Sequence, residues 1–234
     1  MAGLGVHTRT QLQNVLQTMM QAWRSTRLAH PHGQQRLPLR FTHAGVVMED
    51  WLDQRFAHSA DGTGSIWLAF DAGKLIDNPK KMTLRPHKLI AAWVTSLLAA
   101  ASDAPGDGVL IGRDALLHIT AHDPHQAREQ LSCLIEAWIS GLGEPLPVAA
   151  KTALAFVQDG NPALAYEGNE RSIGEVDDPC LARCYPDFDA LNRDGRFEQL
   201  ARTLYAPLQA WATEHVAVTL HAAAADPAPG MEAA

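Results

Sequence analysis

Histidine is the residue type whose spacing comes nearest to a metal site in this sequence. His118, His122 and His125 fall within eight residues, and the first two are four apart. Zinc, however, takes three or four converging ligands. A strand end that runs into a helix cap, with Asp123 accepting amide hydrogen bonds, explains the same pattern. We therefore expect no metal and no cofactor here.

The three cysteines form neither a disulfide framework nor a zinc site. Cys180 and Cys184 are four residues apart without a second Cys/His pair nearby, and Cys133 lies among apolar positions of an expected helix. Unpaired cysteine behaves as a small hydrophobic residue. We expect Cys133 in the core and the other two partly buried.

A basic cluster is the clearest candidate for ligand contact. Lys80, Lys81, Arg85 and Lys88 lie in the positive part of the chain, since residues 1–100 hold 11 Lys/Arg and 6 Asp/Glu whereas the rest holds 8 and 20. Such a cluster attracts a phosphate backbone and makes these four residues DNA-binding candidates. A solvated entrance to a helix is the alternative.

Acidic residues gather between Glu167 and Asp194. This pattern is typical of a solvated loop, and a metal or partner site is the alternative. The members of this stretch are Glu170, Glu175, Asp177, Asp178, Asp187 and Asp189.

Common catalytic signatures are missing. Gly73-Lys74 is followed by Leu75, so no P-loop is present, and neither His-Glu-x-x-His nor Gly-x-Ser-x-Gly occurs. These absences argue against ATP hydrolysis and zinc proteolysis.

Length and composition favour one globular core. The chain has 234 residues, of which 47% are hydrophobic, and its net charge is −7. No apolar run approaches the roughly 18 to 20 residues that span a bilayer. Residues 1–7 lack the basic start and apolar segment of a signal peptide. We expect a cytoplasmic protein with no membrane contact.

Apolar spacing and turn residues predict the elements of the first half. Leu12, Val15, Met19 and Trp23 indicate a helix over 10–27 behind a Thr10-to-Gln13 capping box. The remaining predictions are a strand over 41–48, a short helix or turn over 49–56, a strand over 65–70 paired with the previous strand, and a helix that begins at Pro86 and ends near 101.

The second half is less regular. We predict strands over 109–112, 116–120 and 151–157, and a helix that follows Asp123 and ends at Gly141. Residues 160–196 are expected to be irregular, and a helix over 197–211 is expected to kink at Pro207. Together these elements predict an α/β domain with a mixed sheet covered by helices. We divide the chain into a helix and linker (1–39), the domain (40–221) and a disordered tail (222–234).

Four segments of the chain are distinctive when taken in succession. They read LRPHKLIAAWVTSLL at 84–98, GEPLPVAAKTALAF at 143–156, DPCLAR at 178–183 and FEQLARTLYAPL at 197–208. In this order they resemble the C-terminal domain of the RecC (gamma) subunit of exodeoxyribonuclease V. The resemblance covers roughly residues 40–212 and leaves the N-terminal helix and the alanine-rich tail outside.

The resemblance implies a restriction-endonuclease-like fold whose catalytic centre is lost. It further implies a structural domain that packs against RecB- and RecD-type subunits and lies beside the separated DNA strands. The RecC subunit is several times longer than this chain, which is therefore expected to be one domain of it. Among aromatic residues, Tyr185, Phe188 and Tyr205 are our candidates for partner contacts.

The sequence supports the loss of activity. Nucleases of that fold carry Asp/Glu-x-Lys, in which carboxylates hold Mg²⁺ beside the lysine, and none of the five lysines here has a carboxylate two residues earlier. Active relatives also carry Gln-x-x-x-Tyr on a helix that here presents Leu89 and Trp93. Two alternatives remain, namely a divergent metal-dependent nuclease that uses Asp71 with the acidic stretch, and an interaction module unrelated to DNA.

Overall fold

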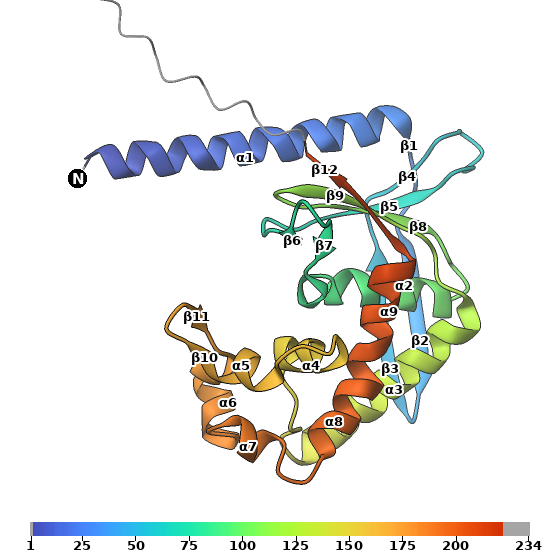
Figure 1. Cartoon of the computed structure of the whole chain (residues 1–234). Coiled ribbons are helices and arrows are strands. Elements are labelled where there is room, and N and C mark those ends of the chain that lie inside the picture. The colour runs from blue at the N-terminus through green and yellow to red at the C-terminus, as the bar shows by residue number, and fades with distance from the viewer. Residues whose placement is uncertain (1, 222–234) are drawn as a thin grey trace, which may run out of the picture.

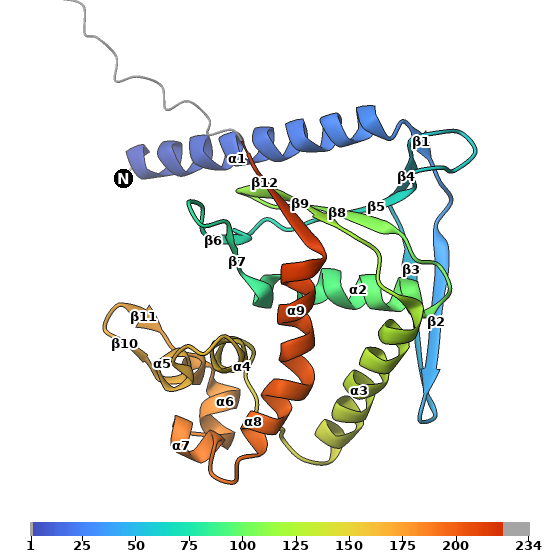
Figure 2. The same ribbon diagram turned by 45° about the vertical axis from the view of Figure 1, so that its right-hand side comes forward.

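The computed structural model describes residues 2–221, apart from the side chains of residues 2–7 and 11. A long helix, α1 (Ala2–Ala29), lies on one face of a six-stranded sheet, and other helices lie on the opposite face (Figures 1 and 2). Val15, Met19 and Trp23 of α1 pack against the sheet. The predicted helix is therefore confirmed, but it begins at Ala2, so Thr10 is an internal residue and not its cap.

The sheet is mixed, as predicted. Its order is β1 (His32–Gly33), β4 (Arg55–Ala57), β5 (Ile66–Phe70), β8 (Asp107–Ile111), β9 (Ala115–Ile119) and β12 (Val216–Leu220). β5 and β8 run parallel, and the other neighbours are antiparallel. A parallel pair needs a long crossover, which contains helix α2 (Ile90–Ala101).

Both faces of the central strands are buried, because side chains alternate along a strand. Leu68 and Val109 face α1, whereas Trp67 and Leu110 belong to the main core on the side of α2. Trp93 of α2 is buried in that core. The strand predicted over 65–70 is confirmed, but its neighbours are β4 and β8, not residues 41–48.

Residues 37–52 form a hairpin outside the main sheet. β2 (Leu37–His43) and β3 (Val46–Leu52) pair antiparallel through a turn at Ala44 and Gly45, whose φ angles are 49° and 79°. The predictions of one strand over 41–48 and of a helix or turn over 49–56 are therefore wrong. Alanine seldom adopts positive φ, so an alanine within an apolar run gives no sequence signal for a turn.

Helix α3 (Pro124–Gly143) starts as the sequence predicts and ends two residues later than Gly141. The Asp123 carboxylate accepts hydrogen bonds from the backbone N–H groups of His125 and Gln126, both at 3.0 Å. Exposed Cys133 lies on this helix, and Cys180 and Cys184 are exposed as well, so their predicted burial is wrong.

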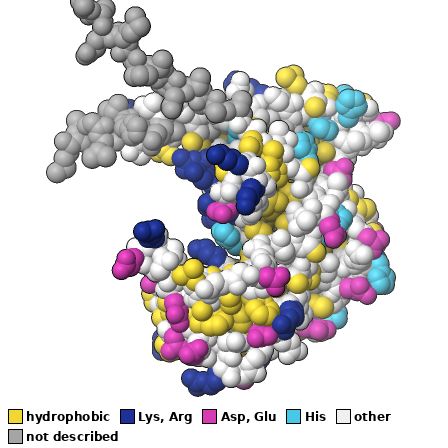
Figure 3. All heavy atoms as spheres, viewed as in Figure 1, with side chains coloured by type: hydrophobic (Ala, Val, Ile, Leu, Met, Phe, Trp, Pro, Cys, Tyr) yellow, Lys and Arg dark blue, Asp and Glu magenta, His cyan; other side chains and the backbone are white. Residues whose placement is uncertain are grey.

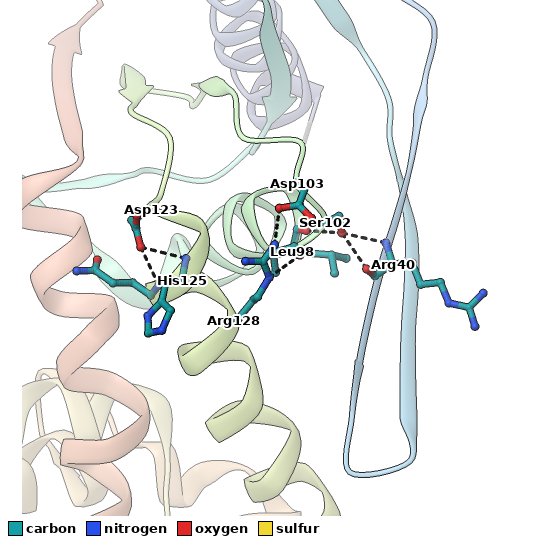
Figure 4. A network of polar contacts seen from close by, with 9 residues as sticks. Arg40, Leu98, Ser102, Asp103, Asp123, His125 and Arg128 are labelled. Atoms are coloured by element: carbon teal, nitrogen blue, oxygen red, sulfur yellow. Dashed lines mark hydrogen bonds and ion pairs between the residues drawn. The ribbon is translucent and has the colours of Figure 1, made fainter.

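A polar network joins α3 to α2 and to the hairpin (Figure 4). Arg128 of α3 forms an ion pair with Asp103. Ser102, at the end of α2, accepts a hydrogen bond from the backbone N–H of Arg40 at 2.9 Å, and its Oγ lies 2.7 Å from the carbonyl oxygen of Leu98. The network fixes β2 and β3 against the helices that cover the sheet.

Residues 150–200 form a helical lobe with its own core. The strand predicted over 151–157 is wrong, because this segment is helix α4 (Ala150–Val157). Residues 160–196, predicted to be irregular, contain α5 (Pro162–Glu167), β10 (Gly168–Asn169), β11 (Ser172–Ile173), η2 (Glu175–Asp177), α6 (Pro179–Cys184) and α7 (Phe188–Leu191). Tyr166, Leu191 and Phe197 are fully buried among them.

The last helix is interrupted, as predicted, near Pro207. α8 (Arg196–Leu200) continues through a π-helical turn, η3 (Ala201–Tyr205), into α9 (Ala206–Glu214). Proline has no N–H to donate, and a wider turn accommodates the missing bond. β12 follows and was not predicted. The tail predicted to be disordered, 222–234, lies outside the described residues.

Candidate nucleic-acid interface

Two of the four predicted DNA-binding residues lie at the tip of a small hairpin. Lys80 and Lys81 are exposed in the turn between β6 (Ile76–Asn78) and β7 (Thr83–Leu84). The Asn78 side-chain oxygen accepts hydrogen bonds from the backbone N–H groups of Lys80 at 3.0 Å and Lys81 at 3.2 Å. This capped turn holds both lysines at the surface.

The other two lie on the 3₁₀ turn η1 (Pro86–Lys88) and directly before it. Arg85 is half-buried, its Nη2 lies 3.2 Å from Asp77 Oδ1, and its backbone N–H donates to Leu75 O at 2.8 Å. Lys88 is exposed. Lys80 and Lys81 thus precede the short strand β7 in the chain, and Arg85 and Lys88 follow it.

A fifth cation, Lys151, comes from the helical lobe. The start of α4 packs against η1. Burial and then the charges of Lys151, Lys88 and Arg85 lower the pKa of His87, with Glu175 acting in the opposite direction. Those three cations therefore lie close enough to His87 to act on it. Sequence reasoning missed Lys151, since no local pattern relates it to residues 63 positions earlier.

Glu175 orients the helix that carries Lys151. Its carboxylate accepts hydrogen bonds from the backbone N–H groups of Lys151 at 3.1 Å and Thr152 at 2.7 Å, and from the Thr152 hydroxyl at 2.9 Å. Ala149, at the N-cap position of α4, has no side chain that can do so. Glu175, a member of the acidic stretch, thus caps α4. The sequence predicted a solvated loop here, with a metal or partner site as the alternative, and not a helix cap.

The surface is hollowed beside these cations. A cavity of about 410 Å³ lies between β7, the end of α4, α9 and β12. Its lining residues are Met82, Thr83, Leu84, Pro86, Gln158, Gln209, Ala212, Thr213, Val216 and Val218. Figure 3 shows Lys and Arg side chains above a hollow on this side, opposite the helical lobe. None of the five cations is among these lining residues, but Met82, Thr83, Leu84 and Pro86 are close to four of them in the chain. We call the surface formed by Lys80, Lys81, Arg85, Lys88 and Lys151 the basic hollow.

The residues with described side chains include no group of three or more His, Cys, Asp or Glu that could hold a metal ion. Asp71, the candidate residue of a divergent nuclease, forms a turn in which its Oδ1 accepts the Gly73 N–H at 2.6 Å. Within the histidine cluster His122 is buried, whereas His118 and His125 are exposed. Exposed cations such as Lys80, Lys81 and Lys88 attract phosphates in general, and such contacts give affinity without base readout; DNA binding by these residues stays a prediction.

The three predicted partner residues lie partly within the core of the helical lobe. The Tyr185 hydroxyl donates to Pro145 O at 2.6 Å, and the Phe188 ring lies 5.5 Å from that of Phe197. Tyr205 is half-buried, and burial raises its pKa. Their partner contacts stay a prediction, and much of their surface already serves internal packing.

Comparison with family models assigns the chain to a known family. A family model described as the RecC C-terminal domain matches residues 1–161, which is more than half of the chain. The chain belongs to the RecC C-terminal domain family. RecC is the gamma subunit of exodeoxyribonuclease V, a helicase–nuclease complex of DNA repair. No curated protein matches the chain.

The matched range corrects the extent of the resemblance. It includes α1, which the resemblance had left outside, and it ends before the segments at 178–183 and 197–208. Among the described residues, no helix of this RecC-type domain has the length and apolarity to cross a membrane.

Proposed function

We propose that this domain is a non-catalytic part of exodeoxyribonuclease V that guides a separated DNA strand and supports assembly with RecB- and RecD-type subunits during recombinational repair of double-strand breaks. The observation that carries the proposal is that helix α4 packs on η1 and brings Lys151 close to Arg85 and Lys88, next to the hairpin that exposes Lys80 and Lys81. These five cations come from β6–β7, η1 and α4. The sequence lacks Asp/Glu-x-Lys, and the described side chains include no group of three or more His, Cys, Asp or Glu that could hold a metal ion, so we infer binding without cleavage.

The fold supports a nuclease-like origin. A mixed sheet with helices on both faces is the architecture expected of a restriction-endonuclease-like domain, and Asp/Glu-x-Lys is absent from the sequence. We infer that the ancestral site was lost and that the scaffold was kept for binding. DNA contact by the isolated domain is accordingly weak and non-specific.

Assembly has a candidate surface at the end of α3. Leu131 and Ile135 of this helix are buried, and Leu134 packs against the same core. Trp138 and Leu142 follow Leu134 at four-residue steps, yet they are 55% and 68% exposed. The buried stripe of the helix thus continues beyond the core that covers it. Large aromatic residues on such a stripe are typical of subunit contacts.

Salt-dependent DNA binding tests the basic hollow. We expect Lys80→Gln/Lys81→Gln to weaken binding of a 30-nucleotide single strand, and to reduce the slope of log K against log salt by about 0.7 for each phosphate that the variant no longer neutralises. Arg183→Gln/Arg193→Gln removes the same charge from exposed positions of the helical lobe and is the matched control. Equal slopes for the two variants would contradict the proposal.

Cleavage assays separate this function from a divergent nuclease. We expect no cleavage of single- or double-stranded DNA with Mg²⁺ or Mn²⁺. Reproducible cleavage that Asp71→Ala abolishes would overturn the non-catalytic assignment.

Co-elution in size-exclusion chromatography tests assembly. We expect the chain to co-elute with RecB- and RecD-type subunits, with and without a forked duplex, and Trp138→Ala/Leu142→Ala to lose the complex. Leu164→Ala, which removes an exposed leucine of α5, is the control. Absence of any complex with the folded chain would refute the assembly role.

A further inference from the structure

A second cavity lies away from the cavity of the basic hollow, between the end of β3, strand β5 and helix α2. Its volume is about 230 Å³. Two aromatic residues on its wall are largely uncovered, since Trp51 is 48% and Phe70 is 50% exposed. The guanidinium of Arg36 lies 4.2 Å above the Trp51 ring and braces it from the neighbouring chain segment. The cavity therefore has an apolar wall that is accessible from solvent.

The cavity borders an open edge of the sheet. β4 pairs with β5 only at Ile66 and Trp67, and one further bond joins Leu68 N to Gln54 O at 3.1 Å. The left-handed Gln54 (φ 50°) then separates β4 from β3. On its other side β5 stays paired with β8 as far as Phe70. Among the described residues, no strand therefore covers the Phe70 end of β5 on the side of the cavity.

The direction of the backbone groups follows from strand geometry. Leu68 N–H points toward β4, because it donates to Gln54 O. Backbone groups two residues apart in a strand point to the same edge. The N–H and C=O of Phe70 consequently face the open edge, where an extended segment could pair with them. Such an edge is a template for strand addition.

The charges around the cavity specify what such a segment carries. Asp50, Asp53 and Asp71 line it, opposed by Lys88 alone among the lining residues. These carboxylates are not grouped as metal ligands. They are spaced along the wall, which suits separate cationic side chains, and their charge disfavours a phosphate backbone. Lys88 marks the boundary between this acidic cavity and the basic hollow.

We propose that this cavity and the open edge of β5 bind an extended, basic segment of a partner protein. The segment pairs with the backbone at Phe70, its apolar residues contact Trp51 and Phe70, and its Lys or Arg side chains meet the three carboxylates. Lys88 borders both surfaces, but the three carboxylates and the open edge of β5 do not belong to the basic hollow, so peptide binding and DNA binding can be tested on separate residues.

Panning a library of random 12-residue peptides against the full chain tests the proposal. We expect the enriched peptides to carry net positive charge and to alternate apolar with basic residues. One enriched peptide, labelled with fluorescein, is then titrated with the chain. We expect Asp50→Asn/Asp53→Asn to weaken its binding about fivefold or more, since the variant cannot form two partly exposed ion pairs. Asp189→Asn, at an exposed position of α7, is the control.

Hydrogen exchange of the backbone amides measures strand addition directly. We expect the bound peptide to slow exchange of the Phe70 amide, and a peptide N-methylated at alternate residues to bind at least tenfold more weakly. Failure to enrich any peptide, enrichment of neutral or acidic peptides, equal binding by the two aspartate variants, or unchanged exchange at Phe70 would each overturn the proposal. DNA binding is measured on the same variants. Altered DNA affinity in Asp50→Asn/Asp53→Asn would assign these carboxylates to the basic hollow and overturn the proposal.

Discussion

The stability of the domain should fall in mild acid because of one buried histidine. His122 is only 5% exposed and stacks between Trp211 and His215, with ring centroids 6.0 and 5.2 Å away. Its Nε2 has no hydrogen-bond partner among the described residues. Burial, and then the charge of His215, lower the pKa of His122 to about 4. The folded state therefore holds this imidazole neutral.

The sign and size of the effect follow from linkage. In the unfolded chain the imidazole has a pKa of about 6.5, so between pH 6.5 and about 4 only the unfolded state binds the proton. Stability is lost as pH falls through that window and is constant, for this group, below it. The full loss is about 3 kcal/mol, and at pH 5 it is about 2 kcal/mol.

Urea denaturation at pH 7.5 and pH 5, followed by circular dichroism, measures this loss. His122→Phe keeps an aromatic ring in the stack and removes the titrating group. When the pH is lowered from 7.5 to 5, the free energy of unfolding should fall in both proteins, and the fall should be smaller in the variant by about 2 kcal/mol. His118→Gln, at an exposed position, should keep the original drop. If His122→Phe shows the same dependence on pH as the unaltered chain, the linkage explanation is refuted.

Three further substitutions test individual contacts. Asp123→Ala removes the cap of α3 and should lower the free energy of unfolding by about 1 kcal/mol. Asp123→Asn, whose side chain can still cap, should keep most of that stability, and equal losses for the two variants would contradict the capping role. Phe197→Ala opens the core of the helical lobe and should cost about 3 to 5 kcal/mol in urea denaturation, and a loss below about 1 kcal/mol would show that the lobe adds little to global stability. Glu175→Ala leaves the start of α4 uncapped and should accelerate hydrogen exchange at Thr152, while Glu170→Ala should not; unchanged exchange would disprove the cap.

Local patterns in the sequence determined the elements whose signals are complete within a few residues. The apolar stripe from Leu89 to Ala101 and the Asp123-Pro124 start of α3 predicted helices that the structure confirms. The predicted start at Pro86 is wrong, because Pro86 begins the 3₁₀ turn η1 and α2 begins at Ile90. A missing Asp/Glu-x-Lys likewise needs no fold to be recognised. The resemblance to the RecC C-terminal domain was predictable for the same reason, because it rests on ordered segments, and the family match confirms it.

Short apolar runs were ambiguous because helix and strand can bury them equally well. The segment 151–157 is a helix only because distant Glu175 caps it and the helical lobe covers it. The turn at Ala44 and Gly45 escaped prediction, since alanine carries no turn signal. β12 was missed because its strand pairs with β9, about a hundred residues earlier.

The residues of the candidate site also differ in whether the sequence or the tertiary structure identified them. Sequence clustering identified Lys80, Lys81, Arg85 and Lys88, whose proximity is local. Tertiary structure alone added Lys151, by packing α4 on η1, and placed Asp50, Asp53 and Asp71 around one cavity. The distribution of charge along a chain can be determined from the sequence. A binding surface depends on which distant segments pack together, and burial of apolar side chains in the main core and in the core of the helical lobe decides that packing.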